Sequence, residues 1–198
     1  MPDEALILAS TSAIRRKLLT AAGVRFEARR PEVDETALKR KMRGKTPKEL
    51  ALALAEAKAL SLSSLRPEAL VLGADQTLDH EGRTFDKPRD LAAARRHLLK
   101  LRGKTHTLHS ALALARGGRI IWRHSASARL TMRDFSREFL AAYAARQGEG
   151  LLTSVGGYKL EEEGAQLFTR VSGEHTTILG LPLLPLLAAL RRRGVLPT

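Results

Sequence analysis

The sequence predicts an α/β fold in which helices flank a mixed sheet, within a single domain that covers residues 1–198. Helical and strand-like patterns alternate along the first half of the chain, and a long strand–turn–strand pattern follows them. The composition, with 43% hydrophobic and 28% charged residues, is typical of a globular protein with a substantial core. No apolar run approaches the roughly 20 residues of a membrane span, and no repeat or linker divides the chain.

The chain is expected to start with a short strand and a helix joined by a hydroxyl-rich turn. Residues 5–9 are apolar, a Ser-Thr-Ser turn follows, and residues 13–22 carry the helical pattern. A serine of the turn can cap this helix, whose first turn contains Arg15 and Arg16. Because cations at a helix N-terminus oppose its dipole, they favour a bound anion such as phosphate. An ordinary turn with surface arginines is the alternative.

The next segment combines an acidic loop with a strongly signalled helix. A second strand is expected over residues 24–28, and the acid-rich residues 31–35 could bind a metal ion through carboxylate oxygens. Thr46, Pro47 and Glu49 form a capping box with proline at the first helical position, which predicts a helix over residues 47–62. Lys58 lies within this Ala/Leu-rich helix, where a lone lysine is expected to extend to water.

The central stretch places an acid and a lysine after an apolar strand. The strand over residues 69–72 ends at Gly73, and Asp75 follows at its exit. Lys87 follows a turn at residues 80–82. In open α/β sheets, ligands bind beyond the ends of such strands, so the pair could hold a phosphate chain and its metal ion. A capping aspartate and a surface lysine are the alternative.

The second half of the chain contains a hairpin and three further helices. His106, His109 and His124 lie in the hairpin without the spacing of metal ligands, so we interpret them as strand-face residues. Neither a G-x-S-x-G elbow nor a Walker A motif is present. The expected elements are helices over residues 91–101, 136–146 and 181–193, strands over 105–115, 119–132 and 165–172, a turn at Gly117 and Gly118, and a glycine-rich loop over 148–157.

The net charge of +13 indicates a polyanionic partner, either a nucleoside triphosphate or a nucleic acid. Aromatic residues make up only 4% of the chain, which supplies few platforms for stacking bases, so a nucleic-acid partner is unlikely. The absence of cysteine excludes disulfides and thiolate chemistry. No basic segment precedes the first apolar run, so we expect a cytoplasmic protein without a signal peptide.

Five motifs in register resemble one family. They are LILASTSAIRRKLL at residues 6–19, PEVDE at 31–35, GAD at 73–75, KP at 87–88, and the stretch 173–183 that ends in LGLPL. Together, over nearly the full length, the chain resembles the Maf proteins, nucleoside triphosphate pyrophosphatases once described as septum-formation inhibitors. A nucleic-acid-binding or division-regulating protein is the alternative from another functional class.

The resemblance implies a fold like that of the inosine triphosphate pyrophosphatases, an elongated mixed sheet flanked by helices with two lobes around a cleft. It also implies hydrolysis to a nucleoside monophosphate and pyrophosphate with Mg²⁺ or Mn²⁺, and makes a homodimer a reasonable expectation. Asp75 is implied to be catalytic, as a general base or a metal ligand, and Glu35 to help hold the metal. The phosphate-binding residues carried over from the family are Ser10, Arg15, Lys58 and Lys87.

Three positions bear on the preferred base. Gln76 and Glu161 resemble the subfamily associated with 7-methyl-GTP, whereas Ile14 replaces the tryptophan of that subfamily and the arginine of the dTTP/UTP subfamily. A carboxylate at position 161 can accept two hydrogen bonds from a guanine edge or favour a cationic methylated purine. The resemblance therefore implies hydrolysis of modified nucleotides such as 7-methyl-GTP, a house-cleaning activity. Hydrolysis of dTTP and UTP is the alternative for the substrate, and a solvated acid is the alternative for Glu161.

Overall fold

The computed structural model describes residues 6–197 and divides the chain into two compact units. The first unit comprises Met1–Gln76, His109–Ala126 and Glu174–Thr198, and the second comprises Thr77–Leu108 and Ser127–Gly173. Three strands contribute residues to both units, namely β3 (Leu70–His80), β5 (Thr105–Arg116) and β6 (Arg119–Met132).

The strands form a seven-stranded mixed sheet, which confirms the predicted α/β class. Its hydrogen-bonded order is β2-β1-β3-β5-β6-β7, and β4 pairs with β3. In the first unit β1 (Leu6–Ala9) pairs in parallel with β2 (Glu27–Arg29) on one side and with β3 on the other. Ala9 lies opposite Gly73 in that register, so the residues that follow both positions emerge at the same level of the sheet.

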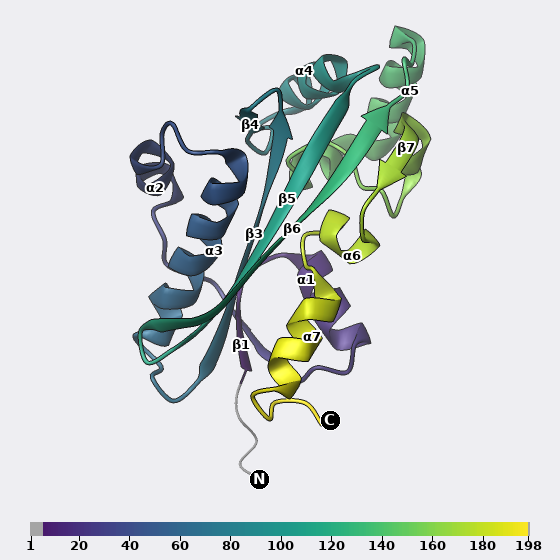
Figure 1. The fold of residues 1–198 in the computed structure, drawn as a ribbon. Coiled ribbons are helices and arrows are strands. Elements are labelled where there is room, and N and C mark those ends of the chain that lie inside the picture. The colour runs from purple at the N-terminus through teal and green to yellow at the C-terminus, as the bar shows by residue number, and fades with distance from the viewer. Residues whose placement is uncertain (1–5, 198) are drawn as a thin grey trace. The chain divides into compact units, whose positions relative to one another are not determined.

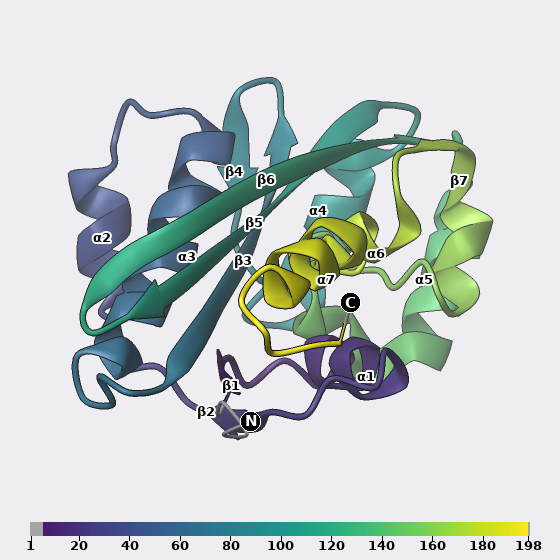
Figure 2. The same cartoon turned by 60° about the horizontal axis from the view of Figure 1, so that its bottom comes forward.

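Helices cover both faces of the sheet in the first unit (Figures 1 and 2). On one face α3 (Pro47–Ser63) contributes Ala51, Ala55 and Ala59 to a core cluster with Ile7 and Val71. These small side chains let the helix approach the strands closely. On the other face α1 (Ala13–Ala21) and α7 (Leu183–Arg191) close a leucine-rich cluster that includes Leu8, Leu19, Leu72, Leu112, Leu186 and Leu190.

Local signals placed the starts of α1 and α3 correctly, whereas the last helix, expected from residue 181, begins at Leu183. The Ser12 hydroxyl accepts from the Arg15 amide at 3.4 Å, as expected for the serine-rich turn. Thr46 and Glu49 form both hydrogen bonds of the predicted capping box. The acidic loop was wrongly interpreted, because Asp34 caps the short helix α2 (Glu35–Lys41) by accepting from the Ala37 amide at 2.8 Å. Within residues 6–197, no three acids of this loop are grouped so that they could hold a metal ion.

Other boundaries differ from the expectations where tertiary pairing extends or replaces a local pattern. The strand expected to end at Gly73 continues to His80, so Asp75 lies inside β3 rather than at its exit. The second strand is confined to Glu27–Arg29. The glycine-rich loop begins as the 3₁₀ helix η1 (Gly148–Thr153), and a second 3₁₀ helix, η2 (Glu163–Leu167), precedes the short strand β7 (Phe168–Ser172). A helical turn not foreseen, α6 (His175–Ile178), precedes α7.

The second unit contains β4 (Arg83–Phe85), α4 (Leu91–Leu101) and α5 (Arg137–Gln147). It also contains residues 77–80 of β3, 105–108 of β5 and 127–132 of β6. Its loop after η1 is anchored by Tyr158, whose hydroxyl lies 2.6 Å from Nε2 of His106. Burial, with a smaller contribution from His80, lowers the pKa of His106 to about 4, so the ring is neutral at pH 7. His106 thus has a packing role, as its place on a strand face suggested.

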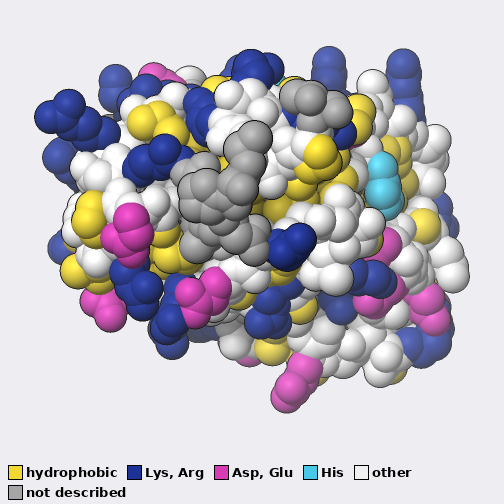
Figure 3. All heavy atoms as spheres, turned by 90° about the horizontal axis from the view of Figure 1, so that it is seen from below, with side chains coloured by type: hydrophobic (Ala, Val, Ile, Leu, Met, Phe, Trp, Pro, Cys, Tyr) yellow, Lys and Arg dark blue, Asp and Glu magenta, His cyan; other side chains and the backbone are white. Residues whose placement is uncertain are grey.

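On the face drawn in Figure 3, the Lys and Arg side chains do not form one continuous patch. On the face in Figure 3, Lys and Arg side chains alternate with Asp and Glu side chains and uncharged groups. Across residues 6–197, no helix is both long and apolar enough to cross a membrane.

Candidate active site

A buried lysine between two carboxylates forms the centre of the candidate site. The Lys58 ammonium lies 2.5 Å from Oδ1 of Asp75 and 2.9 Å from Oε1 of Glu35. Lys58 and Asp75 are each only 8% exposed, whereas Glu35 is partly open to solvent. The expectation that Lys58 extends to water was therefore wrong, because the ammonium finds its counter-charges within the fold.

Arg15 joins this charge cluster from the start of α1. Its Nε donates to the Gly180 carbonyl and its Nη1 to the Ala74 carbonyl, each at 2.9 Å, and Nη1 also lies 3.3 Å from the Ser10 hydroxyl. Burial lowers the pKa of Arg15, while the nearby charges of Asp75 and Glu35 oppose that shift, so the guanidinium remains charged.

The alternation of β3 explains why Asp75 meets Lys58. Residues 71, 73 and 75 point to the face covered by α3, and Gly73 leaves room for that helix. A β-carbon at position 73 would lie 2.7 Å from the Ala59 amide nitrogen and would collide with the Ala55 carbonyl. The missing side chain therefore sets the spacing between the strand that carries Asp75 and the helix that carries Lys58.

Replacing Gly73 with alanine should force α3 away from β3. We expect a loss of about 1–3 kcal/mol in unfolding free energy, as for other overpacked cores, together with reduced turnover. Denaturant unfolding and a pyrophosphate-release assay measure the two effects. Gly150→Ala is the matched control, because a β-carbon there meets nothing closer than 4.0 Å and the backbone is not left-handed. Unchanged stability of Gly73→Ala would contradict this packing argument.

The structure brings together Ser10, Arg15, Glu35, Lys58 and Asp75 within the first unit. Of the other predicted residues in this unit, Ile14 is half-buried on α1, and Gln76 points to the opposite face of β3 from Asp75, where its amide contacts main-chain carbonyls. The two remaining residues, Lys87 and Glu161, are exposed and belong to the second unit.

Sequence reasoning missed the groups that hold Arg15. The Gly180 carbonyl is 165 residues away in the chain, and Ala74 contributes only its backbone. The one usable signal was glycine in the LGLPL motif, since Gly180 has a positive φ of 88°. A β-carbon there would also lie 3.3 Å from Nη2 of Arg15.

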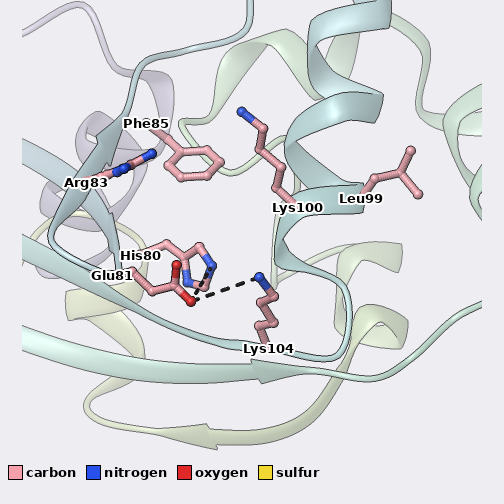
Figure 4. Close-up of a pocket in the computed structure, with 7 residues that line it drawn as sticks. All are labelled: His80, Glu81, Arg83, Phe85, Leu99, Lys100 and Lys104. Atoms are coloured by element: carbon pink, nitrogen blue, oxygen red, sulfur yellow. Dashed lines mark ion pairs between the residues drawn. The ribbon is translucent and has the colours of Figure 1, made fainter.

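A pocket of about 250 Å³ in the second unit contains none of the predicted site residues (Figure 4). Arg83, Lys100 and Lys104 give it positive charge, and Phe85 forms an apolar wall. Within it, the Glu81 carboxylate lies 3.7 Å from His80 and 4.0 Å from Lys104. Because the Glu81 carboxylate is one of the lining groups and lies beside Lys104, we assign no ligand to this pocket.

The donor set of the candidate site fits a divalent cation bound with few protein ligands. Two carboxylates, Asp75 and Glu35, converge on one ammonium, so they can converge on a metal ion that takes part of that space. Among the residues the structure describes, no cluster of three or more Asp, Glu, His or Cys side chains is present. Mg²⁺ commonly uses only one or two carboxylates and completes its shell with substrate phosphates and water.

Comparisons with known proteins identify similar sequences and a similar fold. The chain is 48% identical to the "7-methyl-GTP pyrophosphatase" of Rhizobium meliloti (strain 1021), over 96% of this chain and 97% of that protein. It is 53% identical to the "Nucleoside triphosphate pyrophosphatase" of Caulobacter vibrioides, over 96% of both chains. The solved structure of the Staphylococcus aureus Ham1 protein has the same fold, with a TM-score of 0.50 at 16% identity over 96% of this chain and all of that one.

The family described as Maf-like protein matches residues 5–193, which is nearly the whole chain. The relatives with identities near 50% also align over nearly the whole chain. The chain therefore belongs to the family of Maf-like proteins.

Proposed function

We propose that this protein hydrolyses nucleoside triphosphates to nucleoside monophosphates and pyrophosphate. The observation that carries the proposal is the buried Lys58 ammonium between the Asp75 and Glu35 carboxylates, with Arg15 in the same electrostatic cluster. The names of relatives about 50% identical, each a pyrophosphatase, support the same reaction.

The side chains have different roles in the hydrolysis of the anhydride bond between the α and β phosphates. Asp75 accepts a proton from the attacking water, whose oxygen forms the new bond to phosphorus while the bridging P–O bond breaks and pyrophosphate leaves. Lys58 and Arg15 offset the negative charge that develops on the phosphate oxygens. The Ser10 hydroxyl and the exposed Lys87 are proposed as further phosphate contacts.

The charge balance of the site supports a divalent cofactor. Asp75 and Glu35 carry two negative charges, and Lys58 and Arg15 carry two positive charges, so the four side chains sum to zero. A triphosphate adds about four negative charges, which these side chains alone do not neutralise. Asp75 and Glu35 are the residues that would hold Mg²⁺ or Mn²⁺, which when bound polarises phosphate oxygens and acidifies water.

A purine with a positively charged or hydrogen-bond-donating edge is the proposed base. Three acids follow one another at residues 161–163, and two of them have partners, with Glu162 bound to Lys159 at 3.1 Å and Glu163 to Arg146 at 2.9 Å. Glu161 is exposed, and within residues 6–197 no ion pair is found for it. It is therefore the acid of the three best able to bind a ligand. A relative 48% identical is named a 7-methyl-GTP pyrophosphatase.

Pyrophosphate release across a nucleotide panel with Mg²⁺ or Mn²⁺ tests the proposal. We expect 7-methyl-GTP to be hydrolysed faster than GTP, CTP, UTP and dTTP. Preferred hydrolysis of dTTP and UTP would retain the reaction but overturn the proposed base. No release from any nucleotide by folded protein would overturn the proposed function.

Glu161→Gln should reduce the preference for 7-methyl-GTP over UTP by about tenfold or more, since a hydrogen bond to a charged acceptor is replaced by a neutral one. The measurement is kcat/KM for both nucleotides. Glu162→Gln is the matched control. It makes the same change at the adjacent residue, whose carboxylate already forms an ion pair with Lys159. An identical preference in the Glu161 variant and the wild type would rule out the specificity role.

A further inference from the structure

Gln76 does not share a face of β3 with Asp75, although the two residues are adjacent. Its Nε2 lies 2.9 Å from the Ile178 carbonyl, 3.1 Å from the Thr177 carbonyl and 2.9 Å from the Ser110 hydroxyl. Two of these contacts join the amide to the last residues of α6. Gln76 thus supplies a side-chain donor to both carbonyls at the end of α6, in addition to the Gly180 amide, which donates to the Thr177 carbonyl at 3.0 Å.

Ser110 completes this arrangement from β5. It is fully buried, and its hydroxyl donates to the Thr177 carbonyl at 2.7 Å while it accepts from Gln76. The end of α6 is therefore tied to two neighbouring strands by side-chain hydrogen bonds. Because Ser110 has no exposed surface, it cannot touch a bound nucleotide, and any effect on binding must pass through other residues.

The segment that is hydrogen-bonded to Gln76 and Ser110 continues to the carbonyl that binds Arg15. Residues 177–180 connect the carbonyls held by Gln76 and Ser110 to the Gly180 carbonyl, which accepts from Nε of Arg15 at 2.9 Å. Gly180 adopts a φ of 88°, so this carbonyl is presented by a left-handed residue in a tight turn. The position of residues 177–180 therefore helps to set the plane of the guanidinium, together with the Ala74 carbonyl that accepts from Nη1 at 2.9 Å.

We propose that Gln76 and Ser110 are positioning residues that orient Arg15 through residues 177–180. Gln76 thereby influences the phosphates rather than the base. This inference rests on the proposed function, in which Arg15 binds the phosphate chain. Loss of Gln76 removes the side-chain donor to the Ile178 carbonyl, and loss of Ser110 removes one of the donors to the Thr177 carbonyl, so the segment is held less firmly and the guanidinium loses its alignment.

Ser110→Ala separates this role from a contact with the base. We expect it to weaken the binding of inorganic tripolyphosphate, which has no base, by about threefold to tenfold, the range of one lost hydrogen bond. The KM values for 7-methyl-GTP, GTP and UTP should rise by the same factor. Ser63→Ala is the matched control, since Ser63 is also fully buried and its hydroxyl accepts from the Gly118 amide at 2.9 Å. It should leave both measurements unchanged.

Gln76→Met gives a second, independent variant that removes the donor without adding charge. It should weaken tripolyphosphate binding and leave the ratio of kcat/KM values among the nucleotides unchanged. A shifted base preference with normal tripolyphosphate binding would overturn the proposal and assign Gln76 to base contact. Normal tripolyphosphate binding by Ser110→Ala would overturn it as well.

The NMR signal of the Arg15 Nε–H group tests the positioning without reference to any reaction. In Ser110→Ala and Gln76→Met this proton should exchange with solvent faster than in the wild type and in Ser63→Ala. If the wild type hydrolyses no nucleotide but this difference is found, the proposed function fails and the positioning is supported. Equal exchange in all four proteins would overturn the positioning, whatever the activity.

Discussion

Asp75→Asn should lower turnover by about 10²- to 10⁴-fold, the range of a lost general base. An asparagine side chain cannot take a proton from water, and it is a weak ligand for a hard cation. The fold should persist with a loss of about 1 kcal/mol, because the amide oxygen still accepts from Lys58 and Lys58 keeps its pair with Glu35 at 2.9 Å. Steady-state pyrophosphate release and denaturant unfolding measure the two effects.

Asp79→Asn is a matched control for this variant. Asp79 lies on the same strand, and its side chain accepts from the Gly82 amide at 2.9 Å, which asparagine can also do. It should therefore retain wild-type turnover. Raising the Mg²⁺ concentration separates the two roles of Asp75, since lost metal affinity is restored by excess metal and a lost base is not. Near-normal turnover in Asp75→Asn at all Mg²⁺ concentrations would contradict the assigned mechanism.

Features that depend on a few consecutive residues were predictable from the sequence. The capping box at Thr46 and Glu49 and the turn at Gly117 and Gly118 involve neighbours within three residues, and both are present. The glycines of that turn have positive φ angles of 54° and 72°, as a tight hairpin requires. Local propensity alone decides such elements, so no knowledge of the rest of the fold was needed.

The environment of each site residue could not be predicted in the same way. Whether Lys58 extends to water or pairs inside the protein depends on Asp75, on a different element, and on the absence of a side chain at Gly73. The true length of β3 depends on pairing with other strands, such as that of Leu78 with Phe85 in β4, which maintains the strand beyond the polar Asp75. The motifs therefore suggested candidate residues, whereas the contacts of those residues required the tertiary structure.

Lys58→Met should destabilise the protein by about 3–5 kcal/mol, the cost of leaving a buried charge without its partner. Methionine fills a similar volume, so the loss reflects charge rather than a cavity. Asp75, which is buried in the wild type, would face the Glu35 carboxylate with no ammonium between them. Lys48→Met is the control on the same helix, where the lysine is exposed, and it should change stability by less than about 0.5 kcal/mol.

The double variant Lys58→Met/Asp75→Asn decides whether the unpaired charge is the cause. With both buried charges gone, most of the loss should be recovered, and the double-mutant cycle should give a coupling of at least about 2 kcal/mol between the two positions. Additive effects would show that Lys58 stabilises the helix by packing alone. The double variant also keeps the test decisive if Lys58→Met alone does not fold.

Divalent metal should partly rescue Lys58→Met, because the two carboxylates would then lack a cation. Binding to the folded state alone adds RT ln(1 + [L]/Kd) to its stability, about 2.7 kcal/mol at a concentration one hundred times the dissociation constant. We therefore expect millimolar Mn²⁺ to raise the unfolding free energy of Lys58→Met more than that of the double variant. Equal shifts would argue that Asp75 and Glu35 do not converge on a metal ion. A larger shift in the single variant would locate the cation site at the position the ammonium occupies in the wild type.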